Sequence, residues 1–215
     1  MAYAGALEVQ RHVHTLCIEG RVPDVLLTVE HGPVFTRGRT ARATEYLVPA
    51  DEVDRAAIPV VDVERGGDMT YHGPGQLVAY PIVDLRRHGR DVKQYVRALE
   101  EAAIATLRTY GVDANRRPGF PGVWVREGKI ASIGIYVKGW VTRHGLALNV
   151  DADSAHLGMI HPCGLPVKAV SLCAIAARPV ALSEVEDRFA ADLADLLGWR
   201  LERRTLADLE GRVCV

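Results

Sequence analysis

The sequence predicts one α+β domain over residues 1–215, with a mixed, mostly antiparallel sheet flanked by helices on one side. Short runs rich in β-branched residues alternate with turns that contain Gly or Pro, as in strands joined by hairpins. Three longer stretches repeat apolar residues at helical spacing. The composition, 48% hydrophobic and 25% charged, is ordinary for a globular protein, and the chain shows no repeat, linker or low-complexity tract.

The three helices have recognisable ends. The first is expected over Tyr3–Ile18, before a glycine breaks the apolar pattern. Asp91 is expected to cap the second helix, and Gly111 to end it. Ser183–Glu186 has the spacing of a capping box and is expected to open a third helix through Leu197.

The expected strands cover residues 25–30, 60–64, 76–83, 123–125, 130–137 and 140–150, with a short last strand at 199–201. Arg126–Lys129 is typical of a hairpin turn, and Pro81 indicates an edge strand or a bulge. Residues 33–37 and Met69–Gly75 are expected to be loops.

Composition also excludes several classes. The four cysteines form no CxxC pair and the eight histidines no HxxxH or HExxH pattern, so we expect neither a disulfide framework nor a metal site. The net charge of −1 gives no general attraction for nucleic acid, and no apolar run is long enough for a membrane span. We expect a cytoplasmic protein in which Cys17, Cys173 and Cys214 are structural.

Two residues suggest acyl transfer through a thioester. Cys163 lies between Pro162 and Gly164, which places it in a loop, and Lys129 lies in a glycine-containing segment. The structural alternative for Cys163 is a small apolar side chain in a loop. A reactive thiolate needs a cationic or basic neighbour, and the sequence leaves the choice open among the candidates Lys129, His72, His144 and His161.

A glycine-rich block over Arg65–Gln76 is suited to binding a polar group through backbone N–H groups. It matches neither a Walker A motif nor a dinucleotide fingerprint, and a structural turn is the alternative.

Read together, these segments resemble the octanoyltransferases of lipoate biosynthesis, also called lipoyl(octanoyl) transferases or lipoate-protein ligase B. The resemblance spans nearly the whole chain, in the family's order, and rests on residues 3–10, 30–39, 65–76, 117–119, 129–134, 144–149 and 162–164. His161 departs from it, because the family often has asparagine there, and the loop that holds Gly32 and Arg37 also differs.

The resemblance implies a fold like the catalytic domain of lipoate and biotin protein ligases. It implies that octanoyl acyl carrier protein, whose phosphopantetheine carries the acyl group, is the donor. The implied acceptors are lysines of lipoyl domains in 2-oxoacid dehydrogenase E2 subunits and of the glycine cleavage H protein, with no ATP or metal required. Cys163 would form the acyl-thioester intermediate, and Lys129 would lower the pKa of its thiol and act in proton transfer.

The resemblance also implies a set of substrate-binding residues, in which glycines allow close approach and backbone N–H groups stabilise an oxyanion. These are Arg65, Gly66, Gly67, Asp68, Met69, Thr70, Tyr71, His72, Ser132, Ile133, Gly134, Gly145, Leu146 and Ala147.

Three other functions compete with this one. An ATP-dependent ligase of the lipoate or biotin type would use the same scaffold without a cysteine nucleophile. A non-enzymatic module would bind acylated carrier protein without turnover, and a cysteine hydrolase would release free octanoate.

Overall fold

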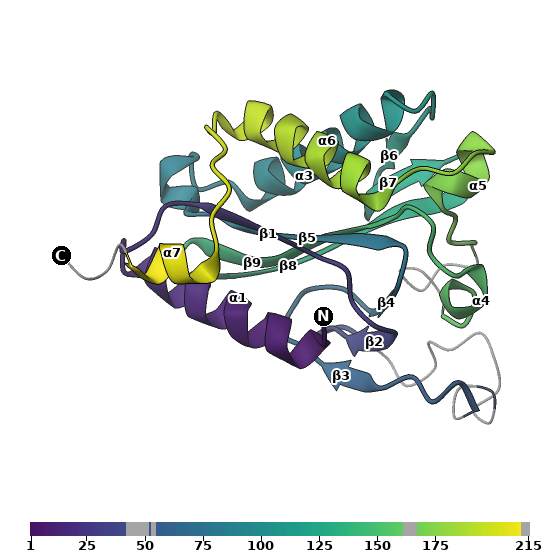
Figure 1. The fold of residues 1–215 in the computed structure, drawn as a ribbon, viewed down its shortest axis with the longest axis horizontal. Helices are drawn as coiled ribbons and strands as arrows, with labels where there is room; N and C mark the ends of the chain where they lie inside the picture. Colours follow the sequence, from purple (N-terminus) through teal and green to yellow (C-terminus); the bar gives the residue numbers. More distant parts are fainter. Residues whose placement is uncertain (42–51, 53–54, 161–166, 212–215) are drawn as a thin grey trace.

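The computed structural model describes residues 1–41, 52, 55–160 and 167–211. Its main sheet has six strands in the order β1-β5-β9-β8-β7-β6, and every neighbouring pair is antiparallel (Figure 1). The strands are β1 (Val25–Val29), β5 (Gln76–Ile82), β6 (Asn115–Arg117), β7 (Phe120–Val125), β8 (Gly128–Lys138) and β9 (Val141–Asn149). The predicted α+β class with a mostly antiparallel sheet is therefore confirmed.

A second, three-stranded sheet packs beside it in the order β3-β2-β4. It comprises β2 (Val34–Arg37), β3 (Val60–Asp62) and β4 (Met69–His72). Both β2 and β4 were expected to be loops. They are strands because their side chains alternate into a small core, where Phe35, Met69 and Tyr71 are buried against Leu157.

Helices cover both faces of the main sheet, so the prediction that they lie on one side is wrong. Figure 1 shows α3 (Val92–Arg108) and α6 (Leu182–Leu197) on one face and α1 (Tyr3–Ile18) on the other. Each face of the sheet is apolar: Leu77 and Leu148 pack under α3 and α6, whereas Val78 and Ala147 pack against α1. The short helices are η1 (Leu85–Arg87), α4 (Ser154–Leu157), α5 (Leu172–Ala176) and α7 (Leu206–Gly211).

The first helix has the predicted bounds, Tyr3–Ile18, and the ends predicted for the other two are confirmed in part. The Asp91 carboxylate accepts the N–H groups of Lys93 and Gln94, so the predicted cap is confirmed. The capping box is wrong: α6 begins at Leu182, its N-cap is Ala181, and none of the described side chains caps it. Gly198 ends α6 in the left-handed conformation, at φ 68°.

The segment after α6 is not a strand, contrary to prediction. There the Trp199 indole donates to Asp24 Oδ2 at 3.2 Å, which holds the segment against the turn between α1 and β1. Pro81 also differs from the expectation of an edge strand, because β5 lies between β1 and β9. The ladder with β9 ends at Ala79, however, so the proline falls where β5 pairs with β1 alone.

No helix in the part of the chain that the structure describes is long and apolar enough to cross a membrane.

The main core predicts the effect of one substitution. Phe189 on α6 is fully buried between this helix and the sheet, so Phe189→Ala is expected to lower the free energy of unfolding by about 3–5 kcal/mol through lost burial and the cavity it leaves. Leu196→Ala, on the exposed side of the same helix, is the control and should change it by about 0.5 kcal/mol or less. Urea unfolding measures both, and equal values for the two variants would contradict this core.

Candidate active site

A β-bulge determines where Lys129 lies. In the hairpin of β7 and β8, Val123 pairs with Ala131, but the next residue, Trp124, pairs with Lys129. Ile130 is therefore an extra residue in β8. A bulge interrupts the alternation of side chains along a strand and is common next to active sites.

The bulge places Lys129 on the same face as Ser132, although the two residues are three positions apart and would lie on opposite faces of a regular strand. Ile130 and Ala131 both pack in the core under α3 and α6, whereas Lys129 and Ser132 line one cavity on the opposite face. The Lys129 side chain is almost fully buried there.

The main chain of Lys129 also holds the segment that follows residue 166. Its N–H donates to Lys168 O at 2.9 Å, and its carbonyl accepts from Val170 N at 3.0 Å. The Asn149 side chain donates to Val170 O at 3.0 Å and adds a second attachment. On the other side, Ile160 lines the Lys129 cavity. Residues 161–166 between these two attachments include the predicted nucleophile Cys163 and lie outside the described residues.

Two small cavities, each of about 20 Å³, meet at Thr70 and Ser132, which line both. The first contains Lys129 and is otherwise lined by Met69, Tyr71, Gln76, Asn149, Leu157, Ile160 and Ala169. The second extends along β8 and β9 and is lined by Tyr3, Arg65, His72, Val78, Tyr80, Gly134, His144, Gly145, Leu146 and Ala147. Ten of the predicted substrate-binding residues therefore line one cavity or the other.

The other four predicted binding residues lie elsewhere. Gly66 donates its N–H to Ile135 O at 2.9 Å and so fastens the glycine-rich block to β8. Gly67 and Asp68 accept hydrogen bonds from Thr40. Ile133 packs against the main core under α3 and α6.

Arg65 is a buried cation that joins the two sheets. Its Nη2 donates to the carbonyl and hydroxyl oxygens of Thr36, both at 2.8 Å, and its Nη1 donates to Gly66 O at 3.1 Å. A methyl group at Gly134 would lie 2.8 Å from Arg65 Cδ, so glycine at that position lets the arginine cross β8.

A chain of hydrogen bonds runs from His72 toward Lys129. His72 Nδ1 donates to Gln76 Oε1 at 2.8 Å, and Gln76 Nε2 donates to Asn149 Oδ1 at 2.8 Å. Asn149 in turn holds Val170, which is bonded to the Lys129 carbonyl. Burial, with the nearby charges of His31 and Arg65, lowers the pKa of His72 to about 3, so this ring is neutral near pH 7.

His144 is the second buried histidine of the site. Its backbone is in the left-handed region, at φ 59°, and its N–H donates to Gln10 Oε1 at 3.0 Å. Its Nε2 lies 3.6 Å from Glu64 Oε2, and Glu64 also pairs with Arg143. Burial lowers the pKa of His144 to about 4 despite the Glu64 charge.

Sequence reasoning gave no role to several residues that the structure brings to the site. Tyr3 stacks on His72 with ring centroids 5.8 Å apart, and Tyr80 contacts His144 edge-on at 6.3 Å. Gln76 and Asn149 link the polar chain. All but Tyr80 belong to the motif segments, but nothing in their spacing shows which face of a strand they occupy.

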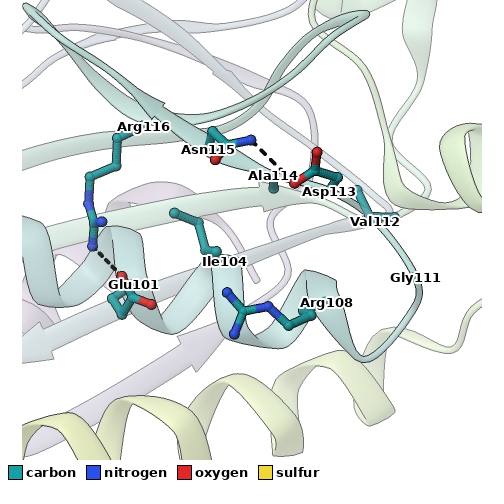
Figure 2. A pocket seen from close by; sticks show the side chains of 9 residues that line it. All are labelled: Glu101, Ile104, Arg108, Gly111, Val112, Asp113, Ala114, Asn115 and Arg116. Carbon is teal, nitrogen blue, oxygen red and sulfur yellow. Dashed lines mark hydrogen bonds and ion pairs between the residues drawn. The ribbon is translucent and has the colours of Figure 1, made fainter.

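A wider cavity of about 400 Å³ lies away from Lys129, between α3 and the start of β6 (Figure 2). Figure 2 shows the Arg116 guanidinium reaching Glu101, with Nη2 and Oε2 2.6 Å apart. Among the described residues, none lines both this cavity and either of the two small cavities. Within the described residues, no three His, Cys, Asp or Glu side chains cluster as metal ligands would.

Comparison with known proteins identifies the class to which this fold and site belong. Residues 2–194 match the model of the lipoyl protein ligase A/B catalytic domain, so the chain belongs to that family. A bipartite lipoate protein ligase from Thermoplasma acidophilum has the same fold, with a TM-score of 0.69 at 17% identity over 95% of this chain and 85% of that one.

Within this family the similar proteins are octanoyltransferases. The octanoyltransferase of Solibacter usitatus is 46% identical over 199 residues, covering 93% of this chain and 90% of the relative. That of Geobacter metallireducens is 44% identical over 202 residues, covering 94% and 92%. The chain is accordingly an acyltransferase of the octanoyltransferase family, which confirms the resemblance, and it acts in octanoyl transfer for lipoylation.

Burial of His72 predicts a pH dependence of stability. Folding keeps its ring neutral down to about pH 3, whereas in the unfolded chain it takes up a proton near its ordinary value of 6.5. Between these values the unfolded state binds more protons, so the free energy of unfolding rises with pH, by up to about 1.4 kcal/mol per pH unit for this group.

His72→Gln is therefore expected to flatten that rise between about pH 4 and pH 6, as measured by urea unfolding at several pH values. His12→Gln, on the exposed side of α1, is the control and should keep the wild-type slope. An unchanged slope in His72→Gln would show that the ring is not held neutral.

Proposed function

We propose that this protein transfers an octanoyl group from octanoyl acyl carrier protein to a lysine of lipoyl domains, as the first step of endogenous protein lipoylation. Cys163 would carry the group as a thioester, and Lys129 would assist its proton transfers. The single observation that carries this proposal is the position of Lys129. Its amine is buried in a cavity that Ile160 also lines, and its main chain is hydrogen-bonded to Lys168 and Val170.

Chain length supports the pairing of these two residues. Cys163 follows Ile160 by three residues, and three residues span at most about 11 Å even when fully extended. Because Ile160 lines the Lys129 cavity, this short separation in the sequence supports the proposed pairing of Cys163 with Lys129.

The proposed reaction has two steps. The Cys163 thiolate attacks the donor thioester, a new S–C bond forms, and the carrier thiolate leaves with a proton. The acceptor amine then attacks the acyl-enzyme, the amide bond forms, and the Cys163 thiolate leaves while the amine loses its proton. Lys129 is the group proposed to hold or pass these protons. No ATP is needed, because exchange between two thioesters is nearly isoenergetic and aminolysis runs downhill, and no metal is invoked.

The cavity along β8 and β9 is the proposed acyl site. Val78, Leu146 and Ala147 give it an apolar wall, and Gly145 keeps β9 close to β5, where a methyl group would lie 2.2 Å from Ala79 O. At about 20 Å³ it has room for little more than a water molecule, so side chains must move apart when an octanoyl chain enters.

The test is the intact mass of the protein after mixing with octanoyl acyl carrier protein without ATP. The wild type is expected to gain a hydroxylamine-labile octanoyl group. Cys163→Ala should gain none, because it lacks the acceptor sulfur, and Lys129→Ala should gain it at least about 100-fold more slowly.

Cys173→Ser is the matched control. Cys173 lies on α5 and its thiol contacts Val180 O at 3.8 Å, and it lines neither cavity. The Cys173→Ser variant should therefore form the adduct like the wild type. An adduct absent from the wild type, with activity only when ATP and free octanoate are supplied, would instead indicate a ligase. Release of free octanoate without amide formation would indicate a hydrolase, and binding without turnover a carrier-binding module.

A further inference from the structure

We propose that Trp124 positions Lys129 for transfer and that Gly122 leaves the space this position requires; the proposal rests on the proposed function, because it concerns the same site. Both residues lie on β7 facing Lys129: Trp124 is its direct cross-strand partner, and Gly122 pairs with Ser132 on the same face. Neither contributes a group that can react with an acyl donor.

The aromatic ring forms one side of the place where the lysine side chain lies. Lys129 Nζ is 5.3 Å from the centroid of the Trp124 ring, within the range of a cation–π contact. Both side chains are buried, so water weakens this attraction little. A lysine side chain has a flexible four-carbon stem, and a fixed ring beside its end restricts where the amine can lie.

The Trp124 ring is itself held in place by contacts with residues other than Lys129. Its Nε1 donates to Phe120 O at 3.1 Å, and the Phe120 ring packs edge-on at 6.5 Å. The Arg117 guanidinium lies 5.2 Å from the Trp124 ring and 5.4 Å from the Phe120 ring. Trp124 is therefore held in place without help from Lys129.

Gly122 forms the other side of the space that the Lys129 side chain occupies. A methyl group there would lie 2.6 Å from Lys129 Cε and 2.4 Å from Ala131 O, and the φ of +128° is one that other residues rarely adopt. Its N–H donates to Glu100 Oε1 at 3.1 Å, while Glu100 Oε2 accepts from Arg116 Nε at 3.0 Å. Helix α3 thus anchors the strand at the point where the lysine needs space.

Transfer rates depend steeply on such positioning, because a displacement of about 1 Å can cost about 100-fold. Trp124→Leu removes the ring face and is expected to lower the kcat of acyl-enzyme formation about 10- to 100-fold. The KM for the acyl donor should stay within about twofold, since the ring lines neither cavity. Trp124→Phe keeps an aromatic face and should recover most of the rate.

Two further variants separate positioning from general damage. Trp140→Leu is the matched control: it removes an exposed tryptophan, with Arg90 at 5.9 Å, and should keep wild-type kcat and KM. In a Lys129→Ala background, Trp124→Leu should lower the kcat of acyl-enzyme formation less than about twofold, because the tryptophan acts on the rate through the lysine. If Trp124→Leu loses its thermal transition, Trp124→Met replaces it, with the same expectations.

The outcomes are distinct. A wild-type protein that forms no octanoyl adduct overturns the proposed function, and the positioning role with it. If the wild type forms the adduct, the proposed function stands and three results would overturn the positioning role alone. Trp124→Leu could keep the wild-type kcat, or Trp124→Phe could be as slow as Trp124→Leu. The third is that Trp124→Leu lowers kcat as much in the Lys129→Ala background as in the wild type.

Discussion

The extra residue at Ile130 is the constraint on which the arrangement of the site depends. Without it, strict alternation along β8 would place Lys129 on the opposite face from Ser132, toward the core under α3 and α6. A lysine there would have to give up its charge or bury it without a partner, which is costly. The bulge lets one strand contribute Ile130 and Ala131 to the core and Lys129 to the cavity.

The second face of the sheet is also covered, and its cover is partly polar. Helix α1 and the small sheet bring His72, His144 and Arg65 into almost complete burial, where the two imidazoles stay neutral and the guanidinium is hydrogen-bonded to Thr36. Such groups are tolerated inside a protein when their hydrogen bonds are satisfied. Among the described residues, neither ring nitrogen of His144 has a partner within hydrogen-bond distance, with Glu64 Oε2 3.6 Å from Nε2. Its backbone lies in the left-handed region, and residues in such conformations cluster at functional sites.

The sequence was sufficient for the parts of the fold that depend on local signals. Asp91 capped its helix, Gly198 ended α6, and the hairpin around Arg126 formed, because each depends on a few neighbouring residues. The turn of that hairpin is shorter than the expected Arg126–Lys129, since β8 already begins at Gly128. The expectations failed where tertiary packing decides. The small sheet forms because distant segments pair, and α6 begins before Ser183. For the site, the family resemblance identified Lys129 as a candidate residue. The face of the strand on which its side chain lies depends on a bulge, which cannot be predicted from the strict alternation of side chains along a strand.

The two hydrogen bonds between Lys129 and residues 168–170 are made entirely by main-chain atoms. These two hydrogen bonds therefore do not themselves require particular side chains at residues 168–170, although Ala169 lines the Lys129 cavity and Val170 packs against the main core. Proline at Val170 is the exception, because it would remove the donor N–H. Two segments that are distant in the sequence can thus keep the same relative position through main-chain hydrogen bonds, which do not require particular amino acids at the positions that form them.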